Sequence, residues 1–116
     1  MRLFNLTSNQ VVSTNIKQAY SFISRLKGLM FTKELNAAGG IHMKPCRSIH
    51  TFFMKYSIDV LYLDKENRVI AIEEKLSPGK VGSYYPGADS AVELPSGTVE
   101  KTGVKAGHKV KFCEQE

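Results

Sequence analysis

The 116-residue sequence contains no tryptophan, only two cysteines and four prolines, and no hydrophobic run long enough to span a membrane. The missing run argues against a transmembrane helix. Residues 1–10 also lack the apolar stretch and the small-residue cleavage site of a secretory signal peptide. We therefore expect a soluble, cytoplasmic protein in which Cys46 and Cys113 are free thiols rather than a disulfide.

The sequence also lacks internal repeats, low-complexity tracts and linker-like stretches. Its length suits one domain covering residues 1–116. Although the isoelectric point is about 9.3, no nucleic-acid-binding signature is present, and most aromatic residues occupy core-like positions. We expect neither a specific nucleic-acid partner nor a membrane partner.

The net charge of +5 is concentrated in one part of the chain. Residues 25–55 contain six cations and one acid (6 − 1 = +5), whereas the remaining residues contain ten of each. Two interpretations stay open. The charges are scattered over a solvated surface, or they create a local positive field that attracts an anion or an acidic partner.

Short segments rich in β-branched and aromatic residues predict strands. The clearest is Ile58–Leu63, which a turn at 64–67 connects to a return strand at Arg68–Glu73, so we predict an antiparallel hairpin. Other strands are expected at 2–6, 11–14 with a continuation at 16–20, 91–94 and 109–112. Helical segments are expected from residue 21 and at 97–103, and a long surface loop at 77–89. The pattern predicts an α+β, predominantly β domain, a compact barrel or sandwich of about six to eight short strands with one or two short helices.

The apolar segment 48–64 carries polar and charged residues inside the run rather than at its ends. A largely buried segment keeps such residues when they are paired or line a site. Asp59 is the acid of this segment, and its nearest candidate partners are Lys55 and Arg25. We expect a structural ion pair with one of them. The other cation would then hold a ligand carboxylate or phosphate, and Arg25 is the first choice because a guanidinium binds bidentately.

Three further patterns carry weaker predictions. His42, Cys46 and His50 recur every four residues, so on an extended strand they would share a face and could bind zinc or copper. However, Pro45 disrupts that geometry and no fourth ligand is nearby. We therefore expect no metal. Cys46 and His50 could instead act as nucleophile and base, but no third orienting group accompanies them. Glu93 points away from its apolar neighbours in the strand, so solvent exposure is expected. An inward Glu93 would satisfy a buried donor.

Several of these segments are similar to a widespread bacterial and archaeal family known as domain of unknown function 192. The resemblance runs in order along nearly the whole chain, through Arg25–Met30, Met54-Lys55, Ile58–Val60, Tyr62–Asp64, Val92–Gly97 and Gly107-His108. The chain departs from the family pattern at Tyr56-Ser57, where many members have Asn-Thr, and at His108, which replaces an acid. The resemblance implies a β-rich fold with no cofactor and no assigned reaction.

We therefore interpret the chain as a non-enzymatic binding module for a small anion, an acidic glycan or an acidic peptide. The predicted binding residues are Arg25, Gly28, Met30, His50, Thr51, Phe53, Met54, Lys55, Asp59 and Glu93. Two alternatives stay open. One is an enzyme of unknown reaction that uses Cys46 and His50. The other is an assembly partner anchored by exposed Phe52, Phe53 or Tyr56.

Overall fold

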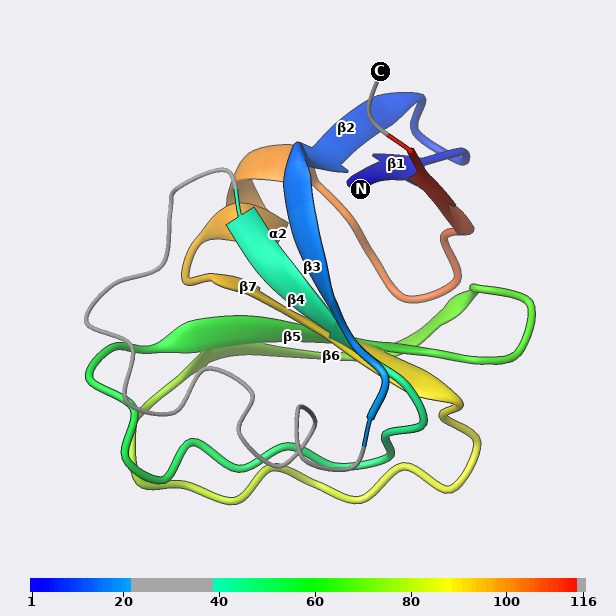
Figure 1. Cartoon of the computed structure of the whole chain (residues 1–116). Coiled ribbons are helices and arrows are strands. Elements are labelled where there is room, and N and C mark those ends of the chain that lie inside the picture. The colour runs from blue at the N-terminus through cyan, green and yellow to red at the C-terminus, as the bar shows by residue number, and fades with distance from the viewer. Residues whose placement is uncertain (22–38, 115–116) are drawn as a thin grey trace.

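The structure is a computed structural model that describes residues 1–21 and 39–114. These residues form eight strands and one short helix (Figure 1). The elements are β1 (Arg2–Asn5), β2 (Gln10–Ser13), β3 (Asn15–Ala19), β4 (Gly39–Met43), β5 (Ile58–Leu63), β6 (Val69–Leu76), β7 (Ser90–Pro95), α2 (Thr98–Thr102) and β8 (Val110–Cys113). None of the helices in the described residues is long and apolar enough to cross a membrane.

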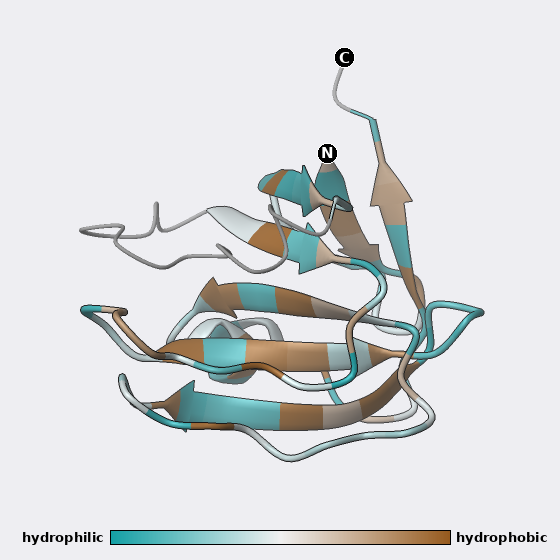
Figure 2. Ribbon diagram, turned by 60° about the horizontal axis from the view of Figure 1, so that its bottom comes forward, coloured by the Kyte–Doolittle hydropathy of each residue, from teal (hydrophilic) through white to brown (hydrophobic). Residues whose placement is uncertain are grey.

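The strands form two sheets. One has three antiparallel strands in the order β2-β1-β8, and the other has five in the order β3-β4-β7-β5-β6. Within the larger sheet only β3 and β4 are parallel. Figure 2 shows hydrophobic residues mainly on the strands and hydrophilic ones mainly in the connections. The two sheets make a sandwich-like, mostly β architecture, as the sequence predicts, and not a closed barrel.

The core has two parts, one on each face of the five-stranded sheet. The first lies between the two sheets and includes Leu3 of β1, Leu61 of β5 and Val92 of β7. The second covers the opposite face and includes Val60 and Tyr62 of β5 with Met54 of the preceding loop. Every residue of β5 and nearly every residue of β7 is buried because both strands are central. Continuous apolar runs suit such strands.

The predicted hairpin is confirmed, since β5 and β6 pair antiparallel with Leu61 opposite Ile72. The predicted helical turn at 97–103 is confirmed as α2. The prediction for residues 16–20 was wrong. They do not continue β2 but form β3, which belongs to the other sheet and pairs with β4. The helix expected from residue 21 onward lies outside the described residues.

Candidate functional site

Two loop segments run side by side along one edge of the molecule, 47–55 before β5 and 80–85 after β6 (Figure 1). Backbone hydrogen bonds join them. The N–H of Thr51 donates to the carbonyl of Lys80 at 2.8 Å, that of Gly82 to Ile49 at 2.7 Å, and that of Tyr85 to Arg47 at 2.9 Å. We call these two segments together the loop ribbon. Because backbone hydrogen bonds hold the two segments together, the side chains of the loop ribbon are displayed from a backbone of defined conformation, which we call its fixed frame.

The loop ribbon is fastened to the large sheet by Glu73 of β6. The carboxylate of Glu73 accepts hydrogen bonds from the hydroxyl of Tyr62 at 2.5 Å and from the backbone N–H of Ser83 at 3.2 Å. Burial and the neighbouring Glu73 raise the pKa of Tyr62, so its hydroxyl stays a donor. Glycine at position 82 leaves room for this contact, because a Cβ there would lie 2.5 Å from Oε1 of Glu73 and 3.2 Å from the carbonyl oxygen of Ile49.

Thr51 is a structural residue of the loop ribbon. Its side chain is buried, its hydroxyl donates to the carbonyl of Ser77 at 2.6 Å, and the same oxygen accepts from the N–H of Lys80 at 2.8 Å. The hydroxyl therefore has both a donor and an acceptor partner within the protein. Thr51 therefore supports the ribbon from within.

A turn closed by the N–H of Met54 donating to the carbonyl of Thr51 at 3.2 Å places two phenylalanines at the tip of the loop ribbon. Phe53 has a φ of 65°, in the left-handed region that is unfavourable for an aromatic residue. Met54 is buried in the core, whereas Lys55 is exposed. Half-buried His50 stacks on Phe52 with ring centroids 5.3 Å apart.

The loop ribbon exposes large apolar side chains. Phe52 is 43% exposed, Phe53 65%, Val81 66% and Tyr84 64%, and these four are the majority of the seven exposed large hydrophobic residues in the described chain. Scattered single exposures are normal, but a cluster on two paired segments indicates a contact surface.

The loop ribbon and its flanks are also positively charged. Residues 44–57 and 75–88 contain five cations and no acid. Two of these cations have partners from outside the segments: Lys44 with Asp89 and Lys75 with Glu100, each at 3.5 Å. Arg47, Lys55 and Lys80 are exposed and form no ion pair with any described residue. The exposed apolar cluster is therefore bordered by three cations that pair with no acid in the described part of the chain.

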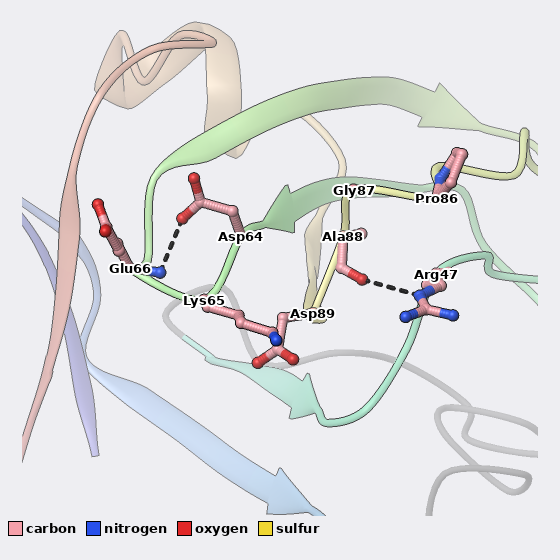
Figure 3. A pocket seen from close by; sticks show the side chains of 8 residues that line it. All are labelled: Arg47, Asp64, Lys65, Glu66, Pro86, Gly87, Ala88 and Asp89. Atoms are coloured by element: carbon pink, nitrogen blue, oxygen red, sulfur yellow. Dashed lines mark hydrogen bonds between the residues drawn. The ribbon is translucent and has the colours of Figure 1, made fainter.

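A pocket of about 520 Å³ opens at the Arg47 end of the loop ribbon (Figure 3). Its wall comes from Arg47, from the β5–β6 turn and from the loop before β7, with the lining residues Arg47, Asp64, Lys65, Glu66, Pro86, Gly87, Ala88 and Asp89. Nε of Arg47 donates to the carbonyl of Ala88 at 3.2 Å, which orients the guanidinium. Oδ1 of Asp64 accepts from the N–H groups of Glu66 and Arg68, both at 2.9 Å.

Asp59 does not pair with Lys55, one of the two partners expected for it, and the other, Arg25, lies outside the described residues. Asp59 is buried, and its carboxylate accepts hydrogen bonds from three backbone N–H groups: Lys75 at 2.9 Å, Gly97 at 3.1 Å and Val99 at 2.9 Å. These bonds tie β5 to the end of β6 and to the start of α2. Asp59 is therefore a structural carboxylate, and three backbone donors stabilise its charge.

Glu93 was expected at the surface, and this prediction was also wrong. It is only 2% exposed and lies on β7 between Ile41 of β4 and Val60 of β5. Its Oε1 has no hydrogen-bond partner among the described residues. Burial raises the pKa of Glu93 to about 8, so at neutral pH it is mostly a neutral carboxylic acid. It does not reach the loop ribbon surface.

The residues considered for metal binding or catalysis have separate environments. His42 is buried, its Nδ1 lies 2.7 Å from the hydroxyl of Tyr20, and it stacks on Phe112. Burial lowers its pKa to about 4. Sγ of Cys46 donates to the carbonyl of Ser48 at 3.2 Å, and Nδ1 of His50 accepts from the N–H of Phe52 at 3.3 Å. The described residues contain no cluster of three potential metal ligands.

The two cysteines are thiols and not disulfide partners, in agreement with the sequence-based expectation.

His108, at the position where the family pattern has an acid, lies with its Nδ1 2.9 Å from Nδ2 of Asn5. It thus joins the β8 end of the chain to β1. Arg25, Gly28 and Met30, which were predicted as binding residues, lie outside the described residues.

The surface that the structure assembles contains some predicted residues and some that the sequence analysis missed. Phe53, Lys55 and His50 were predicted and lie on the loop ribbon. Val81 and Tyr84 were missed. The only sequence signal for them was the aromatic, glycine-rich character of the loop at 77–89, which was interpreted as an ordered surface loop without a role.

The sequence model of the DUF192 family, "Uncharacterized ACR", matches residues 4–112. A "UPF0127 protein" of Pyrococcus horikoshii is 36% identical, covering 95% of this chain and 97% of that protein. Two solved structures have similar folds. One is a Sinorhizobium meliloti protein whose name assigns it provisionally to transcription regulation, with a TM-score of 0.81, 19% identity and coverage of 95% and 89%. The other is a Novosphingobium aromaticivorans protein of unknown function, with a TM-score of 0.82, 20% identity and coverage of 96% and 82%.

Proposed function

The chain belongs to the DUF192 family, and from this premise we propose that it is a non-enzymatic binding module whose loop ribbon binds an acidic peptide segment of a partner protein. One observation carries the proposal: four exposed apolar side chains lie on two paired segments that, with their flanks, contain five cations and no acid.

The choice of an acidic peptide over the other anionic ligands follows from the mixture of side chains. A phosphate or another small anion would leave Phe52, Phe53, Val81 and Tyr84 in contact with water. An acidic glycan could stack on the aromatic rings, but it offers little to the aliphatic Val81. A peptide that combines acidic with apolar residues matches both the cations and the apolar cluster.

The fixed frame of the loop ribbon favours binding further. Its backbone pairing and the anchoring of Gly82 and Ser83 against Glu73 hold the exposed side chains in place before a partner arrives. A preorganised surface loses less conformational entropy on association than a disordered loop does. Thr51 contributes by joining the two segments from inside.

The test is a calorimetric titration at low ionic strength with an acetylated octapeptide in which glutamate alternates with leucine. A second octapeptide with lysine in place of glutamate is the control for charge. We expect the first peptide to bind and the second not to bind, because the loop ribbon is positively charged. Equal binding of both peptides, or of neither, would contradict the proposal.

Matched variants assign binding to the loop ribbon. Val81→Ser should weaken binding several-fold, whereas Val11→Ser, which changes an exposed valine of β2, should leave it unchanged. Lys55→Gln and Lys101→Gln make a similar pair for charge, because Lys101 is exposed on α2. If heparin fragments bind the loop ribbon more tightly than the acidic peptide does, the acidic-glycan alternative replaces our proposal.

A further inference from the structure

The middle of the loop ribbon is hydrogen-bonded like a short pair of antiparallel strands. Its two segments form an antiparallel bridge at His50 and Val81, and the hydrogen bonds on either side of the bridge are made by their chain neighbours. In this type of pair the N–H and C=O groups of the two central residues point away from the partner segment. Each segment therefore has an outer edge.

The two outer edges differ in how the fold uses them. Along residues 80–85, the N–H of Ser83 donates to Oε2 of Glu73, which attaches that edge to β6. Along residues 48–50, the N–H of Ser48 and both the N–H and the C=O of His50 form no hydrogen bond with any described residue. The carbonyl of Ser48 accepts only the thiol of Cys46, at 3.2 Å. Both Ser48 and His50 are half-buried. The 48–50 edge therefore keeps three backbone groups for another strand.

The side chains around this edge alternate as they do on a strand. Ile49 and Thr51 are buried, whereas His50 lies on the outer side with exposed Val81 opposite it in the bridge. His50 also stacks on the exposed ring of Phe52. A strand added beside residues 48–50 would therefore place every second side chain next to this apolar surface.

We propose that the loop ribbon binds its acidic peptide in an extended conformation, as an added strand that pairs with the backbone of Ser48 and His50. The inference rests on the proposed function of the loop ribbon and specifies which peptides it recognises. Strand addition uses main-chain hydrogen bonds for affinity and alternate side chains for specificity. Exposed Arg47 and Lys55, which pair with no acid in the described part of the chain, flank the edge and favour an acidic strand. The preferred segment alternates acidic with apolar residues.

The order of residues in the peptide gives the first test. Calorimetry compares the acetylated octapeptide of alternating glutamate and leucine with an octapeptide of the same composition in which glutamates and leucines follow one another in pairs. We expect the paired order to bind about tenfold more weakly, because an extended chain then has no uniformly apolar side. If the paired order binds equally or more tightly, the inference is wrong while the proposed function stands.

Methylation of backbone nitrogens gives a second test that does not depend on the register of the added strand. One alternating octapeptide has methyl groups on the nitrogens of two internal glutamates, and another has them on those of two internal leucines. In an added strand the N–H groups of every second residue face the loop ribbon, so one methylated peptide should bind about tenfold more weakly than the other. Equal affinities of the two methylated peptides would overturn the inference.

A pair of variants assigns the added strand to the 48–50 edge. Ser48→Pro removes the N–H of residue 48, whereas Ser48→Ala keeps this N–H and removes only the hydroxyl, which donates to the carbonyl of Gly82 at 3.4 Å. Proline is tolerated on a strand edge where the N–H has no partner. Ser48→Pro should weaken the alternating peptide about tenfold and Ser48→Ala less than twofold. Equal effects would contradict this edge. If Ser48→Pro fails to fold, the methylated peptides decide on the parent protein. If no peptide binds the parent, the proposed function and the inference are both wrong.

Discussion

Replacement of Glu93 by glutamine should change how the stability of the protein depends on pH. The carboxyl of Glu93 has a pKa of about 8 in the folded protein, against an ordinary value of 4.5. Between these values the folded protein keeps a proton that the unfolded chain has released. The free energy of unfolding therefore falls as the pH rises through this range, and the stabilisation is complete only below it.

His42 acts in the opposite direction at lower pH. Its pKa is about 4 in the folded protein, against an ordinary value of 6.5. Between these values the unfolded chain binds the proton that the folded protein excludes, so the free energy of unfolding rises with pH. The two effects oppose each other below pH 6.5. Above pH 6.5 the contribution of His42 no longer changes, so the pH dependence that remains from these two residues comes from Glu93.

The size of the effect follows from the shift. A difference of one bound proton changes the free energy of unfolding by about 1.4 kcal/mol per pH unit. Between pH 6.5 and about 8.5, across the folded pKa of Glu93, the parent protein should lose roughly 2 kcal/mol through this group. Glutamine has a similar shape and does not titrate, so the Glu93→Gln protein should lose little through this position.

Urea unfolding of the parent protein and of Glu93→Gln at both pH values measures the effect. Glu74→Gln, which changes an exposed glutamate of β6, is the matched control and should keep the parent's pH dependence. If Glu93→Gln loses as much stability between the two pH values as the parent does, Glu93 is ionised in the folded protein and our account of its burial is wrong.

Four other predictions concern the frame and the surface of the site. Asp59→Asn should lower the free energy of unfolding by about 2–3 kcal/mol in urea titrations, because an amide cannot replace a carboxylate that accepts from three backbone N–H groups; an unchanged midpoint would contradict this. Gly82→Ala should lower both the melting temperature and peptide affinity, since its Cβ would meet Oε1 of a glutamate at 2.5 Å; calorimetry measures both. Phe53→Gly should keep or slightly raise the melting temperature, because glycine adopts the positive φ without strain, yet it should weaken peptide binding; a large loss of stability would refute it. Lys55→Gln should weaken peptide binding without changing the melting temperature, because Lys55 is exposed and forms no ion pair with a described residue; calorimetry and a thermal melt measure the two properties, and a lower melting temperature or unchanged affinity would contradict the prediction.

Local patterns in the sequence predicted local structure well. The hairpin of β5 and β6 is confirmed because both strands and their turn are neighbours in the chain, and so is the short helix α2 after Pro95-Ser96. The prediction for residues 16–20 failed because their pairing partner, β4, lies beyond a long intervening segment. The alternation of apolar and polar residues along a strand indicates that the segment is a strand, but it does not indicate which distant strand it pairs with.

The errors at the two acids have the same cause. Glu93 was assigned to solvent on the assumption that one face of its strand is exposed, but β7 lies between β4 and β5 with both faces covered. For Asp59 the sequence offered Lys55 or Arg25 as a partner, whereas two of its actual donors, Gly97 and Val99, lie beyond the next two strands in the chain. Burial and backbone donors depend on tertiary structure, which residue type alone does not reveal.

Of the two segments that form the candidate site, the sequence predicted a role only for residues 47–55 and not for residues 80–85. Phe52 and Phe53 were named as possible exposed anchors because they lie beside Lys55 in an apolar segment that also carries polar residues. Val81 and Tyr84 joined them only when the structure paired their segment with residues 47–51. This pairing is an irregular backbone contact between two loops and not a regular strand ladder. No periodic pattern of apolar residues in the sequence therefore predicted it.

The most direct test of the loop ribbon as a peptide-binding surface is a chemical-shift titration of the backbone amides with the acetylated octapeptide of alternating glutamate and leucine. We expect the largest shifts at residues 47–55 and 80–85, with little change in β1, β2 and β8. Shifts confined to the three-stranded sheet, or no shifts at any peptide concentration, would contradict the account.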